Sequence, residues 1–330
     1  MAIATPPIIE DEQFSILDSL AREFEEAFAE LSESAERELA GRTFVFSNYG
    51  RELYPYFEAT DVELAPGCII PIKEGRPVAS VDSTCVLVGE TSQGALYAAR
   101  TAVGISYEGA LRRFFRLGPI LVYATSAGLS GLATGIPSVE MDVLLSDHAV
   151  AERYIRNTVE RRVIEALSEP DGGTIVMADG SLKHPFGQMS GHFRRNLGGP
   201  RCIVGFSKSS NLILSEGMAS ALSKAQGPSY YTVERGQVST VLAKFSPDGL
   251  VFRLDLSGPE PDETTLGRIL WNDAFSSGYP DSLKVAHHLS IFSKAEDQGL
   301  KAFVTKRFRV HQLHTFPLRK IALGSFKGSA

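Results

Sequence analysis

The stretch TIVMADGSLKHP (residues 174–185) holds an apolar run that ends in an aspartate followed directly by a glycine. The four apolar residues Ile175–Ala178 lie between Gly172-Gly173 and Gly180, which is typical of a short strand buried on both faces of a sheet. Asp179 would then stand at the carboxyl end of that strand. Because ligands of open α/β sheets bind at this edge, Asp179 either forms the turn with Gly180 or takes part in chemistry.

A second aspartate follows the same pattern earlier in the chain. The stretch VASVDST (residues 78–84) is an apolar run that ends in Asp82 and hydroxyl residues. If the two strands are neighbours, Asp82 and Asp179 close the same edge of the sheet. Two carboxylates brought together without a partner repel each other and raise one pKa, a cost that a bound divalent cation removes. Hard oxygen ligands of this kind favour magnesium or manganese.

The remaining sequence predicts one mixed α/β domain with helical additions. The clearest helix pattern covers 11–39, where apolar residues recur at helical spacing and acids fill the other face. This helix either packs on its own domain or contacts a partner. The polar turn TSQG (91–94) makes its flanking strands antiparallel neighbours, and SPDG (246–249) predicts a second hairpin. Besides the opening strand, strands are predicted at 78–90, 95–107, 118–126, 199–210, 239–246 and 250–257, and further helices begin near Ser146 and Pro280.

The helix that begins near Ser146 carries two candidate acids, Glu160 and Glu165. They are five residues apart, about 140° around the helix axis, so only one of them can easily face the aspartates. We favour Glu160 because it lies near the middle of the helix. For either glutamate the alternative is a solvated face that forms salt bridges with neighbouring arginines.

The stretch GYPDSLKVAHH (residues 278–288) places Tyr279 and His287 eight residues apart, about two helical turns, and on nearly one face. A histidine that faces two carboxylates and a metal could orient a water, protonate a leaving oxygen or bind a phosphate. A histidine with a purely structural role is the alternative. His288 lies on the next face of the helix and is the natural control.

The net charge of −6 is distributed unevenly along the 330 residues. Residues 1–40 hold eleven acidic residues and two arginines, whereas residues 298–330 hold seven basic residues and no acid. This polarity predicts a basic surface able to hold phosphates, with solvated faces that average out after folding as the alternative. A second basic segment, 183–208, holds Lys183, Arg194, Arg195, Arg201 and Lys208 without an acid.

The cysteine content and the hydropathy pattern predict a cytoplasmic protein without a membrane segment. The chain has three widely separated cysteines and no CxxC or HExxH spacing, which favours reduced thiols and disfavours a structural zinc site. No apolar stretch approaches the roughly 20 residues that span a bilayer. The N-terminal sequence MAIATPPIIEDEQ lacks the basic and apolar regions of an export signal.

The ordered motifs VASVDST, VERRVIEAL, IVMADGSL, IVGFSKSSNL and GYPDSLKVAHH resemble the NurA nucleases, the DNA-end-processing partners of the hexameric translocase HerA. The resemblance covers roughly residues 78–295. It implies an RNase H-like mixed sheet flanked by helices, with an N-terminal helical extension, and a homodimer. It further implies manganese-dependent 5′–3′ exonuclease and endonuclease activity on DNA. Family members often carry Asp-Gly-Ser at the first aspartate, whereas this chain has Asp82-Ser83-Thr84.

The resemblance also implies roles for individual residues. It assigns metal binding to Asp82, to Asp179 and to an acidic residue on the intervening helix, for which Glu160 is our choice. Tyr279 and His287 match the active-site tyrosine and histidine of the family in type and spacing. Apart from the resemblance, the basic segment 183–208 supplies Lys208, Arg194 and Arg195 as candidate contacts for DNA phosphates. Lys208 would end the strand that follows the Asp179 strand, and a plain surface lysine is the alternative there.

We therefore expect residues 1–45 to form an acidic helix for dimer or partner contact and residues 46–330 to form the nuclease domain. The chain has no Walker motif, so processive movement would need a separate HerA-type ATPase. The expected process is end resection in double-strand break repair, with manganese as the cofactor and magnesium as the alternative. Two other functions compete, namely a non-catalytic adaptor of a DNA translocase and an RNase H-like ribonuclease.

Overall fold

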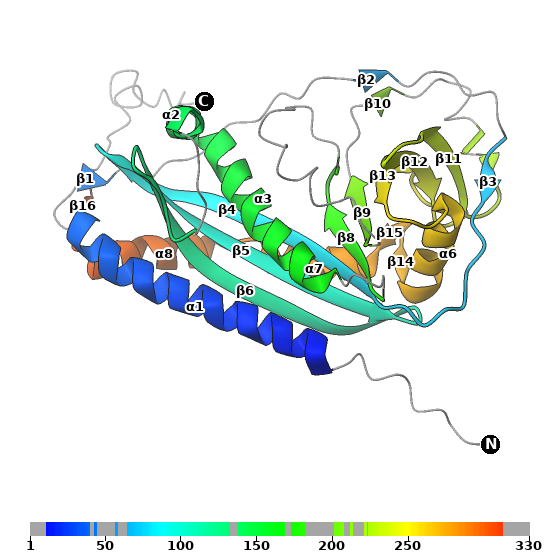
Figure 1. Ribbon diagram of the computed structural model, residues 1–330, viewed down its shortest axis with the longest axis horizontal. Helices are drawn as coiled ribbons and strands as arrows, with labels where there is room; N and C mark the ends of the chain where they lie inside the picture. The colour runs from blue at the N-terminus through cyan, green and yellow to red at the C-terminus, as the bar shows by residue number, and fades with distance from the viewer. Residues whose placement is uncertain are drawn as a thin grey trace, which may run out of the picture.

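The protein is described by a computed structural model that covers residues 11–39, 43–44, 57–58, 65–132, 138–168, 173–182, 201–207, 212–213, 221–222 and 224–312. A ten-stranded mixed sheet forms its centre, with helices on both faces (Figure 1). Among the described helices, none is long and apolar enough to cross a membrane.

The strands of the sheet follow the order β3-β11-β12-β13-β9-β8-β4-β5-β6-β7. They are β3 (Gly67–Cys68), β4 (Val78–Thr91), β5 (Gly94–Tyr107), β6 (Ala110–Thr125), β7 (Gly128–Ser130), β8 (Ile175–Asp179), β9 (Cys202–Ser207), β11 (Ser229–Glu234), β12 (Val238–Lys244) and β13 (Phe252–Ser257). Three short pairs stand apart: β1 (Thr43–Phe44) with β16 (His311–Gln312), β2 (Phe57–Glu58) with β10 (Leu212–Ile213), and β14 (Phe275–Ser276) with β15 (Tyr279–Pro280). The helices are α1 (Asp11–Leu39), α2 (Ser138–Ser146), α3 (His148–Leu167), α6 (Asp262–Asn272), α7 (Asp281–Ser290) and α8 (Lys294–Arg307).

The part of the sheet that matters for the site runs from β6 to β9. Strands β4, β5 and β6 form an antiparallel meander, α3 follows, and β8 then pairs with β4 in parallel and with β9 in parallel. A meander followed by two parallel strands is the core of an RNase H-like sheet. The expected mixed α/β fold flanked by helices is confirmed.

The register between β4 and β8 brings the two aspartates together. The parallel ladder runs from Val78 opposite Ile175 to Val81 opposite Ala178, so the next residue on each strand is an aspartate. Asp179 is the last residue of β8, as expected. Asp82 does not end its strand, because β4 continues to Thr91 through its long hairpin with β5. The prediction that both aspartates close their strands is therefore wrong for Asp82.

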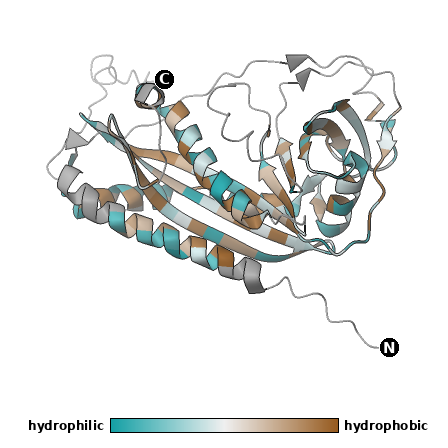
Figure 2. Ribbon diagram, in the orientation of Figure 1, coloured by the Kyte–Doolittle hydropathy of each residue, from teal (hydrophilic) through white to brown (hydrophobic). Residues whose placement is uncertain are grey.

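Two helical layers cover the sheet. On one face α1 packs on β6 and α3 packs on β4 and β5, around a core that includes Leu17, Phe24, Val81 and Val159. On the other face α7 crosses β4 and β5, with α6 and α8 on either side. Hydrophobic and hydrophilic residues alternate along α1 and α3 in Figure 2, as amphipathic helices require.

Helix α1 fills the predicted range 11–39. Its Leu17 and Phe24 are buried, so its apolar stripe covers the sheet of its own chain. Asp18, Glu25 and Glu26 are exposed on the remaining surface of the helix. The helix therefore packs on its own domain, and its acidic face is available to solvent.

Helix α3 begins at His148, close to the start near Ser146 that the sequence predicts. The side chain of Asp147 accepts hydrogen bonds from the backbone N–H groups of Ala149 and Val150, which caps α3. At the other helix predicted from sequence, near Pro280, the chain forms two helices. The first ends at Ser290, and a capping box of Ser293 and Glu296 starts α8.

Candidate active site

Asp82 is the central acceptor of the site. Its Oδ2 lies 2.7 Å from His287 Nδ1 and accepts a hydrogen bond of 3.0 Å from Ser290 Oγ. Its Oδ1 accepts one from the backbone N–H of Ser83 at 2.9 Å. Only 6% of Asp82 is exposed. The carboxylate is thus held in one orientation by a strand and by the last turn of α7.

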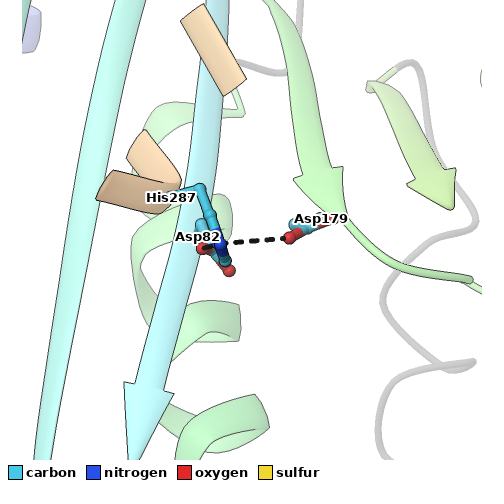
Figure 3. Close-up of side chains that lie close together, drawn as sticks. All are labelled: Asp82, Asp179 and His287. Carbon is cyan, nitrogen blue, oxygen red and sulfur yellow. Dashed lines mark hydrogen bonds and ion pairs between the residues drawn. The ribbon is translucent and has the colours of Figure 1, made fainter. Parts of the chain in front are cut away.

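Asp179 faces the same imidazole from the neighbouring strand. Its Oδ2 lies 3.8 Å from His287 Nδ1, and its Oδ1 accepts a long hydrogen bond of 3.5 Å from Tyr279 OH. Figure 3 shows His287 beside Asp82, with a dashed line to Asp179. One ligand atom from each of Asp82, Asp179 and His287 lies within 4.8 Å of the other two. Two carboxylates and an imidazole at this spacing fit a divalent cation.

Helix α7 is fixed to the sheet at its first turn, which positions His287 further along. Ser282 Oγ donates to the carboxylate of buried Asp273 and lies 2.5 Å from Ser80 Oγ of β4. Asp273 also accepts from Ser106 Oγ on β5 at 2.8 Å. A Cβ on Gly104 would lie 2.4 Å from the carbonyl oxygen of Ser282, so only glycine lets the helix approach β5 this closely.

The turn after Asp179 is held by another buried aspartate. Gly180 has φ +116, a conformation that favours glycine, and this explains the Asp-Gly sequence. Asp255 of β13 accepts from Ser181 Oγ and, at 3.0 Å, from the backbone N–H of Leu182. Asp255 therefore stabilises the turn, while Asp179 directs its carboxylate to Tyr279 and His287. The Asp179-Gly180 motif therefore forms the turn and also places the Asp179 carboxylate in the cluster with Asp82 and His287.

Glu160 lies on α3, on the opposite face of β4 from α7. It is 8% exposed and therefore buried. Burial raises the pKa of Glu160 to about 8, and the nearby Asp82 and Asp179 add to the effect. Glu165 instead pairs with Arg161 at 3.5 Å and is partly exposed. Of the two helical acids, Glu160 is the one that is electrostatically coupled to the aspartates.

Tyr279 is anchored by aromatic packing. Its ring centroid lies 5.1 Å from that of Phe206 in an edge-to-face contact and 5.4 Å from that of Phe252. Burial raises the pKa of the phenol, and the negative charges of Asp179 and Asp82 raise it further. Tyr279 therefore stays protonated and donates its hydrogen bond. It belongs to β15, two residues before α7 begins.

The remaining candidates fall into two groups. His288 is exposed, whereas its neighbour His287 contacts Asp82. Lys208, Arg194 and Arg195 lie outside the described residues.

Sequence reasoning missed Ser290, Asp273 and Asp255, which orient the site. The available signal was the serines of α7, since Ser282 and Ser290 lie on its apolar face and are fully buried.

The protein has an RNase H-like sheet in which Asp82 and Asp179 occupy adjacent positions of two parallel strands. The chain is similar in fold to solved structures of NurA and of endonuclease V. No protein-family model matches the chain, and no curated protein does.

Three of these structures illustrate how distant the similarity is. The NurA nuclease from Sulfolobus solfataricus is 12% identical, with 74% of this chain and 88% of that chain covered and a TM-score of 0.46. NurA bound to dAMP and manganese is 12% identical, with 72% and 89% covered and a TM-score of 0.34. The catalytic domain of human endonuclease V is 11% identical, with 72% and 86% covered and a TM-score of 0.37. At these values the chemistry of the site follows from its own residues.

Proposed function

We propose that this chain hydrolyses the phosphodiester bonds of DNA with the help of a divalent cation. The cluster of Asp82, Asp179 and His287 supports this proposal, because two carboxylates face each other across an imidazole. Such an arrangement is unfavourable unless something positive shares it. Manganese is the proposed cation, and magnesium is the alternative.

The cation would be held by Asp82 and Asp179, with Glu160 as the third acid. When bound, a divalent cation supplies positive charge for a substrate phosphate and for the leaving oxygen. Amides or hydroxyls at these positions would bind it more weakly. Glu160 has a pKa of about 8, so in the protein without the cation it holds a proton at neutral pH. It would lose that proton when it takes part in cation binding.

His287 is the proposed proton carrier. Its Nδ1 faces Asp82, which fixes the ring, so transfer to or from a substrate oxygen would use Nε2. The side chain of His287 is 39% exposed and is therefore accessible to a substrate. Tyr279, protonated and hydrogen-bonded to Asp179, would orient that carboxylate.

The proposed biological setting is the cytoplasm, where a homodimer would act at DNA ends. It would work as a 5′–3′ exonuclease and endonuclease with a HerA-type hexameric ATPase in double-strand break repair. Backbone phosphates would be bound without reading sequence, partly through Lys208, Arg194 and Arg195. The exposed acidic face of α1, with Asp18, Glu25 and Glu26, is the proposed contact for a dimer mate or for the ATPase. The division into residues 1–45 and 46–330 is part of this proposal.

The first experiment measures cleavage of labelled linear DNA, single- and double-stranded, with manganese, magnesium or EDTA. Wild type is compared with Asp179→Asn and with Asp248→Asn, an aspartate exposed in the β12–β13 hairpin. We expect metal-dependent cleavage that is lost in Asp179→Asn and kept in Asp248→Asn. Equal activity in all three proteins would assign the cleavage to a contaminant or to another site.

Two further arms separate the competing functions. An RNA–DNA hybrid cleaved in preference to DNA would favour the ribonuclease, since that activity depends on the 2′-hydroxyl. Absence of cleavage by wild type on every substrate, also with a HerA-type ATPase added, would favour the adaptor.

A further inference from the structure

A hollow of about 120 Å³ lies between β4 and α3, on the face of β4 opposite α7. It begins at Ser83, the residue that follows Asp82, and continues past Thr84. On the helix side it is lined by Arg153 and Arg156. Asp82 and Ser83 are consecutive residues of β4, so the hollow and the acidic site share this part of the strand.

The strand pattern explains why the hollow exists. The ladder between β4 and β8 ends with Val81 opposite Ala178, because β8 stops at Asp179. Strand β4 continues for nine residues beyond Asp82, and within the described part of the chain no strand extends the β8 side of this segment. Helix α3 runs along it, tied by the hydrogen bond of 2.6 Å from the backbone N–H of Leu87 to Glu152. The hollow is therefore a direct continuation of the edge that carries both aspartates.

Arg153, Arg156 and Glu160 lie on one side of α3. Their spacings of three, four and seven residues bring them within about 40° of Glu160 around the helix axis. At 1.5 Å per residue, Arg156 stands about 6 Å and Arg153 about 10 Å along the axis from Glu160. Arg156 and then Arg153 thus lie at increasing distances from the acidic site, along the part of β4 that β8 does not cover.

The charges that face the hollow favour an anion. Arg156 is exposed, and its Nε lies 3.4 Å from the side-chain oxygen of its neutral neighbour Asn157. Its positive charge also acts on Glu160, whose pKa it lowers against the effect of burial. The acid in the lining, Glu152, accepts the hydrogen bond from Leu87, which engages one of its oxygens. Ser83 and Thr84 complete the wall of the hollow, and their hydroxyl oxygens lie 2.9 Å from Thr101 Oγ1 and 3.3 Å from Ser290 Oγ. The arginines therefore carry the proposed contact, since guanidinium groups are usual partners of a phosphate.

We propose that this hollow binds the phosphate next to the one that is cleaved, with Arg156 as its main contact and Arg153 as the contact further along. The proposal rests on the proposed nuclease function and defines its substrate as an oligonucleotide strand that extends along β4. A phosphomonoester or a single nucleotide would leave the hollow empty.

The test uses single-stranded oligonucleotides in which one phosphate at a time is replaced by a neutral methylphosphonate. Wild type, Arg156→Gln and Arg153→Gln are compared with Arg162→Gln, a control on the same helix that is paired with Glu23 of α1. We expect Arg156→Gln to raise KM roughly tenfold, with less change in kcat. One neutral linkage beside the scissile phosphate should weaken wild type similarly and leave Arg156→Gln unaffected.

A second measurement does not depend on cleavage. Binding of a fluorescent oligonucleotide to the full chain in EDTA, at several salt concentrations, should show a log K slope reduced by about one in Arg156→Gln. The slope of Arg162→Gln should equal that of wild type. Cleavage by wild type with equal KM and slope in Arg156→Gln and Arg162→Gln would overturn the phosphate site alone. Absence of metal-dependent cleavage by wild type would overturn the nuclease function itself.

Discussion

Two buried aspartates lie at opposite ends of α7, and their surroundings differ. Near the start of the helix, Asp273 is 3% exposed and accepts hydrogen bonds from Ser106, Ser282 and the backbone N–H of Ala274. Near its end, Asp82 is 6% exposed and shares the imidazole of His287 with a second carboxylate. Burial is nearly equal at the two ends, so burial alone does not distinguish them.

The difference lies in what satisfies each carboxylate. Burial raises the pKa of Asp273, but hydrogen bonds from Ser282 and Ser106 act against this and stabilise its charge within the protein. Asp82 has donors on both oxygens and still faces Asp179. A carboxylate enclosed by neutral donors supports the fold, whereas a pair of facing carboxylates is arranged for a cation from outside.

The largest expected effects separate these two roles. Asp82→Ala should reduce metal-dependent cleavage by at least about 10³-fold, because it removes a proposed cation ligand. Its free energy of unfolding without metal should stay within about 1 kcal/mol of wild type, since lost repulsion offsets lost hydrogen bonds. Asp273→Ala should lower that free energy by about 3 kcal/mol, because it leaves several buried donors without an acceptor.

Denaturant unfolding in EDTA, together with the shift in Tm on adding manganese, checks both variants. Wild type and folded Asp273→Ala should gain Tm with manganese, and Asp82→Ala should not. A manganese shift that persists in Asp82→Ala would remove the distinction between the two ends of α7.

The two adjacent histidines test the end of α7 that carries the chemistry. His287→Ala should lower kcat by roughly 10²-fold while manganese binding is retained, because the imidazole is assigned to proton transfer. His288→Ala, at an exposed position, should match wild type in both respects. Isothermal titration with manganese in parallel with cleavage assays measures the two quantities. Lost manganese binding in His287→Ala would make the imidazole a ligand instead.

Helices and strands of this molecule could be predicted from the sequence where the hydrophobic pattern and the turn or capping residues indicate the same element. The hairpin of β4 and β5, the strand β8 and the start of α3 at Asp147 all carry clear signals, and their adjacency brings Asp82 near Asp179. The first half of β6 was missed, because residues 112–116 are charged or aromatic and mostly exposed. Helix α6 was also missed, although its first turn holds Asp262 and Glu263.

The supports of the site could not be predicted, because they join distant parts of the chain. Asp273 meets Ser106 across 167 residues, and Ser290 meets Asp82 across 208. Nothing in the local sequence distinguishes Asp273 from Asp82. Likewise, the end of β4 at Thr91 is set by its pairing with β5, so Asp82 gave a false signal for the end of its strand.

Glu160 offers a pH-dependent test of the same comparison on the α3 side. Its folded pKa of about 8 exceeds the ordinary glutamate value of 4.5, so the metal-free folded state binds more protons than the unfolded state between these values. Stability should therefore fall as pH rises through this range, by on the order of a few kcal/mol. Glu160→Gln should remove this part of the slope. Unfolding in EDTA at several pH values between 5 and 8 measures it, and parallel curves for the two proteins would contradict the assignment.

The smallest effects concern the serines at the two ends of α7. Ser290→Ala removes a donor to Asp82 Oδ2, so it should lower kcat/KM several-fold, since the carboxylate loses one constraint on its orientation. Ser282→Ala removes the hydroxyl that donates to Asp273, so it should cost about 1–2 kcal/mol of stability and lower kcat/KM less than Ser290→Ala does. Both hydroxyls are fully buried on one helix, and both substitutions remove the same atom. Cleavage and unfolding assays on the two variants therefore compare a hydroxyl that donates to Asp82 with one that donates to Asp273. Equal losses of activity in the two variants would mean that α7 acts as one rigid support, with no division between its structural and its chemical end.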